Sequence, residues 1–147
     1  MKTAILLSAI IFISFNINAQ KINSSDVPLE VRTAFTAMYP NESNVKWELE
    51  NGKYEAEFKA TGVVTSVLFL PSGSYLQTET EIPVSSLPPG VNSYAAKNFP
   101  GKTISEATRI IDANGTISYE AEIGKSDYLF DTDGAYISKS TDLNDDK

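Results

Sequence analysis

Two pairs of glutamates are the residues whose types and spacing best suit chemistry. Glu55 and Glu57 lie in a Tyr-Glu-Ala-Glu segment, and Glu120 and Glu122 lie in a second copy of it. If each segment is a strand, the carboxylates of a pair are about 7 Å apart on one face. A glycosidase can use carboxylates at such a separation as acid and base. The same alternation is also typical of the wet face of a sheet, and we favour that interpretation.

Other kinds of chemistry are limited by the composition. The sequence contains 0 His and 0 Cys. This excludes Ser-His-Asp and Cys-His nucleophiles, thiol chemistry and most zinc or copper sites. We therefore predict no catalytic residue, no cofactor and no metal.

A calcium loop is the second candidate site, at Asp131 and Asp133 before Gly134. An EF-hand loop needs further oxygen ligands and a bidentate glutamate at its twelfth position. Here that position is Asp142, and the residues before it have the pattern of a strand. Because Asp-Gly is also a strong hairpin signal, we predict a turn without metal.

The segments that must position these carboxylates occur twice, in residues 24–82 and 83–143. Each copy runs from a proline through an aromatic-proline pair and the Tyr-Glu-Ala-Glu segment to a glycine turn before tyrosine. The paired positions are Pro28 and Pro88, Tyr39 and Phe99, Tyr54 and Tyr119, Phe69 and Phe130, Gly73 and Gly134, and Tyr75 and Tyr136. A repeated order predicts a repeated structural motif. We predict an α+β fold of two tandem units, each a helix plus a four-stranded antiparallel sheet.

A helix that packs on its sheet is predicted to open each unit. In the first unit Val31, Phe35 and Met38 fall on one stripe, and the helix is expected to end before Pro40. Trp47 shares the parity of the apolar positions of its strand and is expected in the core. The predicted strands cover 45–50, 54–59, 62–69 and 75–82, then 104–111, 117–123, 128–131 and 136–143.

The N-terminal residues 1–19 have the pattern of a secretory signal peptide, with Lys2, an apolar run and a small-residue cleavage site at Ala19. The apolar run is shorter than the roughly 20 residues of a membrane span, and the absence of cysteine excludes a lipoprotein anchor. Residues 20–147 then form a single domain whose charge is 11 basic minus 19 acidic residues, or −8. We expect an exported protein, periplasmic or extracellular, with no nucleic-acid partner and no membrane insertion.

With these motifs in place, residues 27–82 and 87–143 resemble the PepSY-like, β-lactamase-inhibitor-like family. The resemblance rests on the opening prolines, the aromatic-proline pairs, Trp47-Glu48, the Tyr-Glu-Ala-Glu segments and the glycine turns. It implies a secreted chain with a tandem helix-and-sheet unit. It also implies protein binding, since β-lactamase inhibitory proteins of this architecture clamp an enzyme with the exposed sheet face. It supplies no catalytic residue. Ala107 replaces Trp47 in the second copy, where looser packing is expected.

Two function classes follow from this pattern. The favoured one is an exported non-enzymatic protein-binding module, an inhibitor or regulator of an extracytoplasmic enzyme, whose partner is an exported protein or peptide. The alternative is a carboxylate-based hydrolase or small-ligand binder that uses the acidic sheet face. The candidate partner-binding face consists of Tyr75, Tyr136, Glu48, Glu55, Glu57, Glu120 and Glu122. Alternation places both tyrosines on the wet parity; the other interpretation is that they pack across neighbouring strands.

Overall fold

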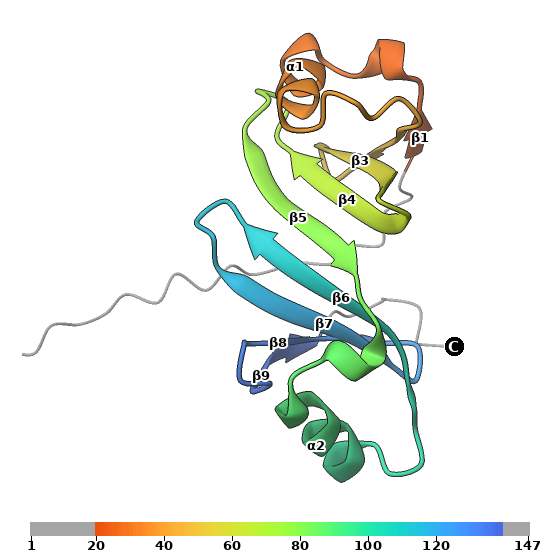
Figure 1. Cartoon of the computed structure of the whole chain (residues 1–147), viewed down its shortest axis with the longest axis vertical. Helices are drawn as coiled ribbons and strands as arrows, with labels where there is room; N and C mark the ends of the chain where they lie inside the picture. The colour runs from red at the N-terminus through yellow and green to blue at the C-terminus, as the bar shows by residue number, and fades with distance from the viewer. Residues whose placement is uncertain (1–19, 140–147) are drawn as a thin grey trace, which may run out of the picture.

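A single antiparallel sheet of nine strands dominates the computed structural model, which describes residues 20–139 (Figure 1). The strands are β1 (Gln20–Ile22), β2 (Lys46–Glu50), β3 (Lys53–Ala60), β4 (Val63–Phe69), β5 (Tyr75–Glu81), β6 (Ile104–Asp112), β7 (Ile117–Ile123), β8 (Asp127–Phe130) and β9 (Tyr136–Lys139). The helices are α1 (Leu29–Met38) and α2 (Pro89–Asn98), preceded by the 3-10 turns η1 (Ser24–Asp26) and η2 (Val84–Ser86). Strand order in the sheet follows the chain.

The prediction of two helix-plus-four-strand units is wrong, because the strands do not form two separate sheets. β5 pairs with β6 from Gln77 opposite Asp112 to Glu81 opposite Thr108. β1, which was not predicted, adds a ninth strand beside β2. In a separate unit β5 would be an edge strand with unpaired backbone groups, and pairing with β6 satisfies them.

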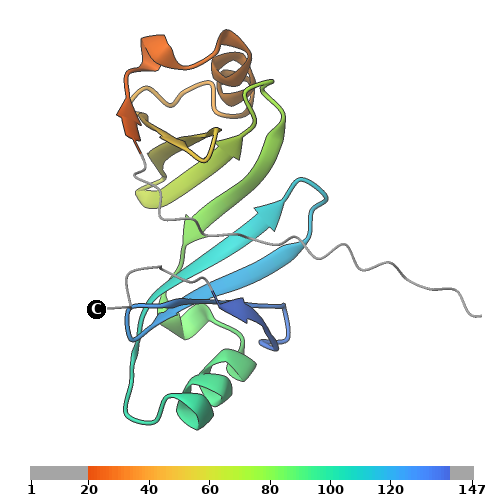
Figure 2. The ribbon, with the colours of Figure 1, turned by 180° about the vertical axis from the view of Figure 1, so that it is seen from behind.

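Both helices pack on the same side of this sheet, called here the helix side. Residues directly opposite each other on paired strands share a face, so the register traces each face across the sheet. The helix side carries Trp47, Ala56, Val67, Thr78, Ile111 and Ile117. The other face, called the open face, carries Glu48, Glu55, Leu68, Gln77 and Asp112. α1 and α2 lie at opposite ends of the long axis, with β5 and β6 between them (Figures 1 and 2).

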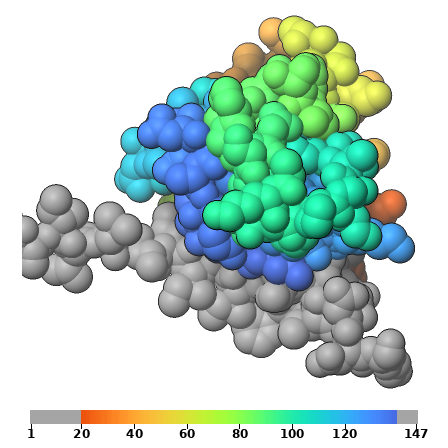
Figure 3. All heavy atoms as spheres, turned by 90° about the horizontal axis from the view of Figure 1, so that it is seen from below, coloured from red at the N-terminus to blue at the C-terminus, as the bar shows by residue number. Residues whose placement is uncertain are grey.

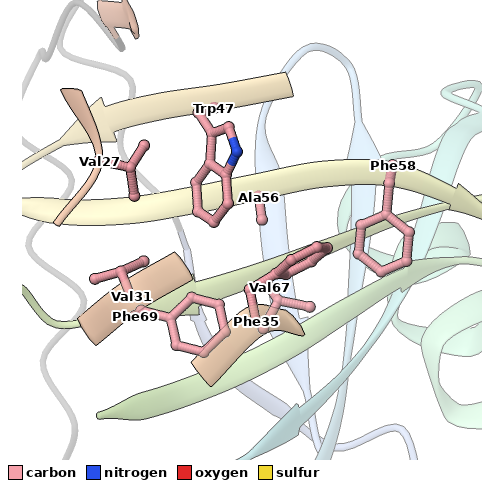
Figure 4. Close-up of a cluster of buried hydrophobic side chains, with 8 residues drawn as sticks. All are labelled: Val27, Val31, Phe35, Trp47, Ala56, Phe58, Val67 and Phe69. Carbon is pink, nitrogen blue, oxygen red and sulfur yellow. The ribbon is translucent and has the colours of Figure 1, made fainter. Parts of the chain in front are cut away.

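The first core joins Val27, which follows η1, and α1 to strands β2 to β4 (Figure 4). Phe35 is buried, and its ring meets those of Trp47 and Phe58 edge-on at 5.4 and 5.3 Å between centroids. The core positions predicted for Phe35 and Trp47 are thus confirmed. The one predicted for Met38 is wrong, since this side chain is 42% exposed. Tyr39, one residue later, stacks on Phe35 instead.

The second core lies beneath α2 and is built from side chains of different sizes than the first. Figure 3 shows the segment with η2 and α2 lying over the strands of the second half. Ala95 and Ala107 are smaller than their counterparts Phe35 and Trp47, and both are buried. Tyr94 and Tyr128 fill the space, with Tyr94 edge-on to Phe130 at 5.3 Å and Tyr128 4.9 Å from Phe99. Larger side chains on neighbouring positions therefore compensate for the two alanines.

A glycine turn touches the start of each helix. Gly73 has φ +81°, and a Cβ placed on it would lie 2.6 Å from the carbonyl oxygen of Glu30. Gly134 has φ +80°, and its Cβ would lie 2.7 Å from the Cα of Gly90. Only glycine fits both the backbone conformation and the contact, so these turns fix where each helix begins over the sheet.

Three sequence predictions lie wholly or partly outside the described residues: the signal peptide of residues 1–19, the part of the predicted strand 136–143 that follows residue 139, and Asp142. Within 20–139, neither helix has the length and apolar character needed to cross a bilayer.

Candidate binding face

All five glutamates of the predicted partner-binding face lie on the open face. Glu48 is directly opposite Glu55 across β2 and β3. Glu57 is opposite Lys46, and their side chains form an ion pair of 2.7 Å. Glu120 and Glu122 lie on β7, with β4, β5 and β6 between them and the first group. The structure therefore divides the predicted acids into two groups on one surface.

The two tyrosines lie on the helix side, so the parity assigned to them is wrong. Tyr75 pairs with Phe69 while Gln77 pairs with Leu68, which leaves Leu76 as a bulge residue. The Tyr75 ring packs on the first core, and its hydroxyl donates to the carbonyl oxygen of Ile111 at 2.9 Å. One extra residue reverses the alternation that the sequence shows.

Tyr136 follows the same rule in the second half. It pairs with Phe130 while Ser138 pairs with Leu129, so Ile137 is the bulge residue. Its ring stacks on Tyr94 of α2 at 5.1 Å with an interplanar angle of 4°. The Tyr136 ring thus lies at the margin of the second core, 45% exposed, and the open face has no tyrosine at these two positions.

The predicted turn at Asp131 is confirmed. Gly134 N–H donates to the carbonyl oxygen of Asp131 at 3.0 Å. The Asp131 carboxylate accepts the N–H groups of Asp133 and Ala135 at 2.9 and 2.8 Å. This carboxylate holds the turn by hydrogen bonds to the backbone. No group of three or more metal-ligating side chains comes together among residues 20–139.

A line of alternating apolar and acidic side chains crosses the middle of the open face. We call it the diagonal stripe; it consists of Leu68, Glu79, Ile110, Glu120 and Leu129, one on each strand from β4 to β8. Glu79 is directly opposite Ile110, and Glu120 is directly opposite Leu129. Ile110 is 6% exposed although it belongs to neither helix-side core. Ile110 is therefore covered by its neighbours, and the aliphatic surface that the stripe exposes comes from Leu68 and Leu129, which are half-buried.

Burial among these side chains changes the protonation of the acids. It raises the pKa of Glu120 to about 8, with a smaller contribution from the negative charges of Asp127 and Glu79. Burial also raises the pKa of Glu79, although the Gln77 amide donates a hydrogen bond of 2.6 Å to its carboxylate. Burial also raises the pKa of Glu55, although a hydrogen bond with Ser66 acts in the opposite direction and lowers it. In each of these three carboxyl groups the ionised form is disfavoured, and a cation placed beside the group would lower its pKa.

The open face is also unevenly charged. Its basic residues are on the first three strands: Lys21, Lys46, Lys53 and Lys59. On β5 to β8 the only base is Arg109, which is opposite Tyr119 on the helix side. The acids on the open face of β5 to β7, apart from the turn-holding Asp112, are Glu79, Glu81, Glu106, Glu120 and Glu122. Glu106 and Glu122 are directly opposite each other, an arrangement of like charges that opposes strand pairing.

Sequence reasoning did not select Leu68, Glu79, Ile110 or Leu129 as site residues. A signal was present in the adjacent isoleucines Ile110 and Ile111, since neighbours on a strand point to opposite faces and both faces must then be apolar. Leu68 gave a similar signal, because Leu68 and Val64 have one parity of this strand while Val67 and Phe69 have the other, so both faces carry apolar residues. Finding the stripe required the pairing of β5 with β6.

Comparisons with known proteins agree with this architecture. A family model described as "Putative beta-lactamase-inhibitor-like, PepSY-like" matches residues 14–64 and 52–138. No curated protein matches the chain. Several solved structures share the fold. A "putative periplasmic" protein of Bacteroides eggerthii has a TM-score of 0.69 at 23% identity, over 78% of this chain and 88% of that one.

A DUF2874 family protein of Bacteroides uniformis has a TM-score of 0.69 at 25% identity, over 77% of this chain and 88% of that one. A BLIP-like protein of Bacteroides fragilis has a TM-score of 0.63 at 23% identity, over 80% and 89%. The resemblance seen in the sequence motifs is confirmed. The two family matches together span most of the sequence, and the chain belongs to the β-lactamase-inhibitor-like, PepSY-like family.

Proposed function

We propose that this chain is an exported, non-enzymatic protein-binding module, an inhibitor or regulator of an extracytoplasmic enzyme, and that the open face is its binding surface. The observation that carries the proposal is the placement of both helix-side cores on one face of an unbroken sheet. Within residues 20–139, neither helix covers the open face, and strands across the sheet contribute side chains to it. A broad surface of this kind suits a macromolecule better than a small ligand.

The chemistry of the open face supports binding without turnover. Glu55 and Glu57 lie at alternate positions of one regular strand, and Glu57 forms an ion pair with Lys46. The chain has no histidine or cysteine to act beside them. The periplasmic description of the Bacteroides eggerthii relative and the signal-peptide pattern support the exported location.

Retention of partners by immobilised residues 20–147 tests the binding surface. The native exported fraction is passed over the wild type, over Ser118→Arg beside Ile110 on the open face, and over Asn92→Arg on the exposed side of α2. We expect a protein retained by the wild type and by Asn92→Arg but lost with Ser118→Arg. Equal retention by all three rejects the open face. Circular dichroism of each variant confirms that it is folded.

The alternative hydrolase function is tested separately with glycoside, ester and peptide substrates. We expect no turnover above a blank. Turnover that disappears in Glu55→Gln or Glu57→Gln would replace the binding proposal with a carboxylate enzyme.

A further inference from the structure

We propose that the partner presents Lys or Arg side chains to the diagonal stripe, with their aliphatic stems on Leu68 and Leu129 and their charged ends at Glu79 and Glu120. This inference rests on the proposed function and specifies the chemistry of the partner. The occupant is a basic segment of a protein surface.

The alternation of side chains along the stripe matches the two parts of a lysine or arginine. Paired strands are about 4.8 Å apart, so each acid of the stripe has an aliphatic residue on the neighbouring strand. Glu79 has half-buried Leu68 diagonal to it on β4, and Glu120 has half-buried Leu129 directly opposite on β8. Lys and Arg bury their methylene stems on apolar surface while the charged end seeks a polar partner. An acidic or purely apolar side chain would satisfy only half of these positions.

Charge complementarity favours the same partner. On the open face, β5 to β7 carry the five glutamates already listed, and no basic side chain of β5 to β8 lies there. Glu106 opposite Glu122 adds repulsion that a cation between them would relieve. The negative field also increases the rate at which a basic surface is captured.

The groups that face the two acids are mostly negative or neutral. Around Glu120 lie Glu106 and Thr108 of β6, Ser118 and Glu122 of β7, Asp127 and Leu129 of β8, and Glu79 and Glu81 of β5. Around Glu79 lie Ser66 of β4, Gln77 and Glu81 of β5, and Thr108, Ile110 and Asp112 of β6, with Glu50 and Glu55 further away. A bound cation would reverse this environment and favour the ionised carboxylates.

Binding should therefore release protons. The pKa of Glu120 is about 8 in the free protein, so this group is largely protonated at neutral pH. A cation beside it lowers that pKa, and the proton leaves as the partner binds. Affinity should rise with pH toward about 8 and then level off.

The test uses decalysine as probe and isothermal titration calorimetry as readout. Residues 20–147 of the wild type are compared with Glu79→Gln/Glu120→Gln and with Glu30→Gln/Asp133→Asn. The second double variant removes the same number of carboxyl groups at exposed positions on α1 and the β8–β9 turn. We expect at least about tenfold weaker decalysine binding for the first, an unchanged affinity for the second, and no binding of decaglutamine. At pH 7 the binding enthalpy of the wild type should differ between phosphate and Tris buffers, because the two buffers take up the released protons with different heats.

The proposal is overturned if the wild type does not bind decalysine, or if both double variants bind it equally. If spermine binds as tightly as decalysine, the stripe is a site for small cations, and the proposal of a protein partner is rejected. If Ser118→Arg abolishes capture of a native partner while decalysine does not bind, the open face stands and the cationic chemistry fails. If Ser118→Arg also leaves capture unchanged, the proposed function fails with it.

Discussion

The Tyr75 hydroxyl donates a hydrogen bond to the carbonyl oxygen of Ile111, 2.9 Å away, across the junction of β5 and β6. Its ring packs on the first core, whereas the acceptor belongs to the strand that follows α2. Beside it, the Ala113 N–H donates to the carbonyl oxygen of Leu76 at 2.8 Å. A side chain of one half thus fixes the backbone of the other.

Removing this hydroxyl should loosen the junction. We expect Tyr75→Phe to lower the free energy of unfolding by about 0.5–1.5 kcal/mol, because it leaves the ring packing in place and removes the hydrogen bonds of the hydroxyl with the Ile111 carbonyl oxygen and with Thr78 Oγ1. Urea unfolding measures the change, and amide exchange at Ala113 should accelerate. Tyr54→Phe is the control, since the Tyr54 hydroxyl makes no hydrogen bond within residues 20–139. Equal losses in both variants would argue against a role for the hydrogen bond.

Phe35 should be the most sensitive residue of α1. We expect Phe35→Ala to cost about 3–5 kcal/mol, because it opens a cavity between Trp47 and Phe58. Met38→Ala, on the same helix but 42% exposed, should cost less than about 1 kcal/mol. Chemical denaturation of the two variants gives the comparison. A loss below about 1 kcal/mol for Phe35→Ala would contradict the first core as described.

The contact between Gly73 and α1 gives a third prediction. We expect Gly73→Ala to cost about 2–4 kcal/mol, since it adds a backbone clash with Glu30 to the strain of positive φ. Gly52→Ala is the matched control, because Gly52 has φ +71° and open space around its Cβ position; it should cost about 1 kcal/mol. Thermal unfolding of both variants separates the clash from the strain. Similar losses would mean that the turn does not press on the helix.

The pH dependence of stability should reveal the buried carboxyl of Glu120. Its pKa is 4.5 as a free side chain and about 8 in the fold. Between these values the unfolded state binds fewer protons, so the free energy of unfolding falls as pH rises from about 4.5 to about 8. We expect Glu120→Gln to flatten this slope and to gain about 1–3 kcal/mol at pH 8 while changing little at pH 4. Urea unfolding at both pH values, with Glu30→Gln as the exposed control, decides it.

Local patterns in the sequence were sufficient for the helices and for much of the core. Helix α1 is predicted by the spacing of Val31 and Phe35 and by Pro40, which ends the helix. The burial of Trp47 is predicted by its parity along the strand. These features depend on residues a few positions apart, where period and propensity act directly. The glycine turns were visible for the same reason.

The single sheet and the stripe could not be predicted in this way. β5 has the sequence YLQTETE, which has too few apolar residues to indicate a central strand. Its position depends on pairing with β6, and strand partners distant in the chain leave no local trace. The bulges at Leu76 and Ile137 reverse the parity of Tyr75 and Tyr136. Simple alternation therefore assigns the glutamates to the open face, where they lie, but assigns the two tyrosines to the wrong face.

The match between strand order and chain order has a consequence for how this sheet forms. Each of the eight ladders joins strands that follow one another in the chain, and only the β1–β2 and β5–β6 ladders span a helical connection. Such contacts close short loops, so the entropy lost before the first ladder forms is small. Folding can begin at any hairpin and extend strand by strand in both directions. We expect a low contact order and rapid folding for a protein so rich in strands.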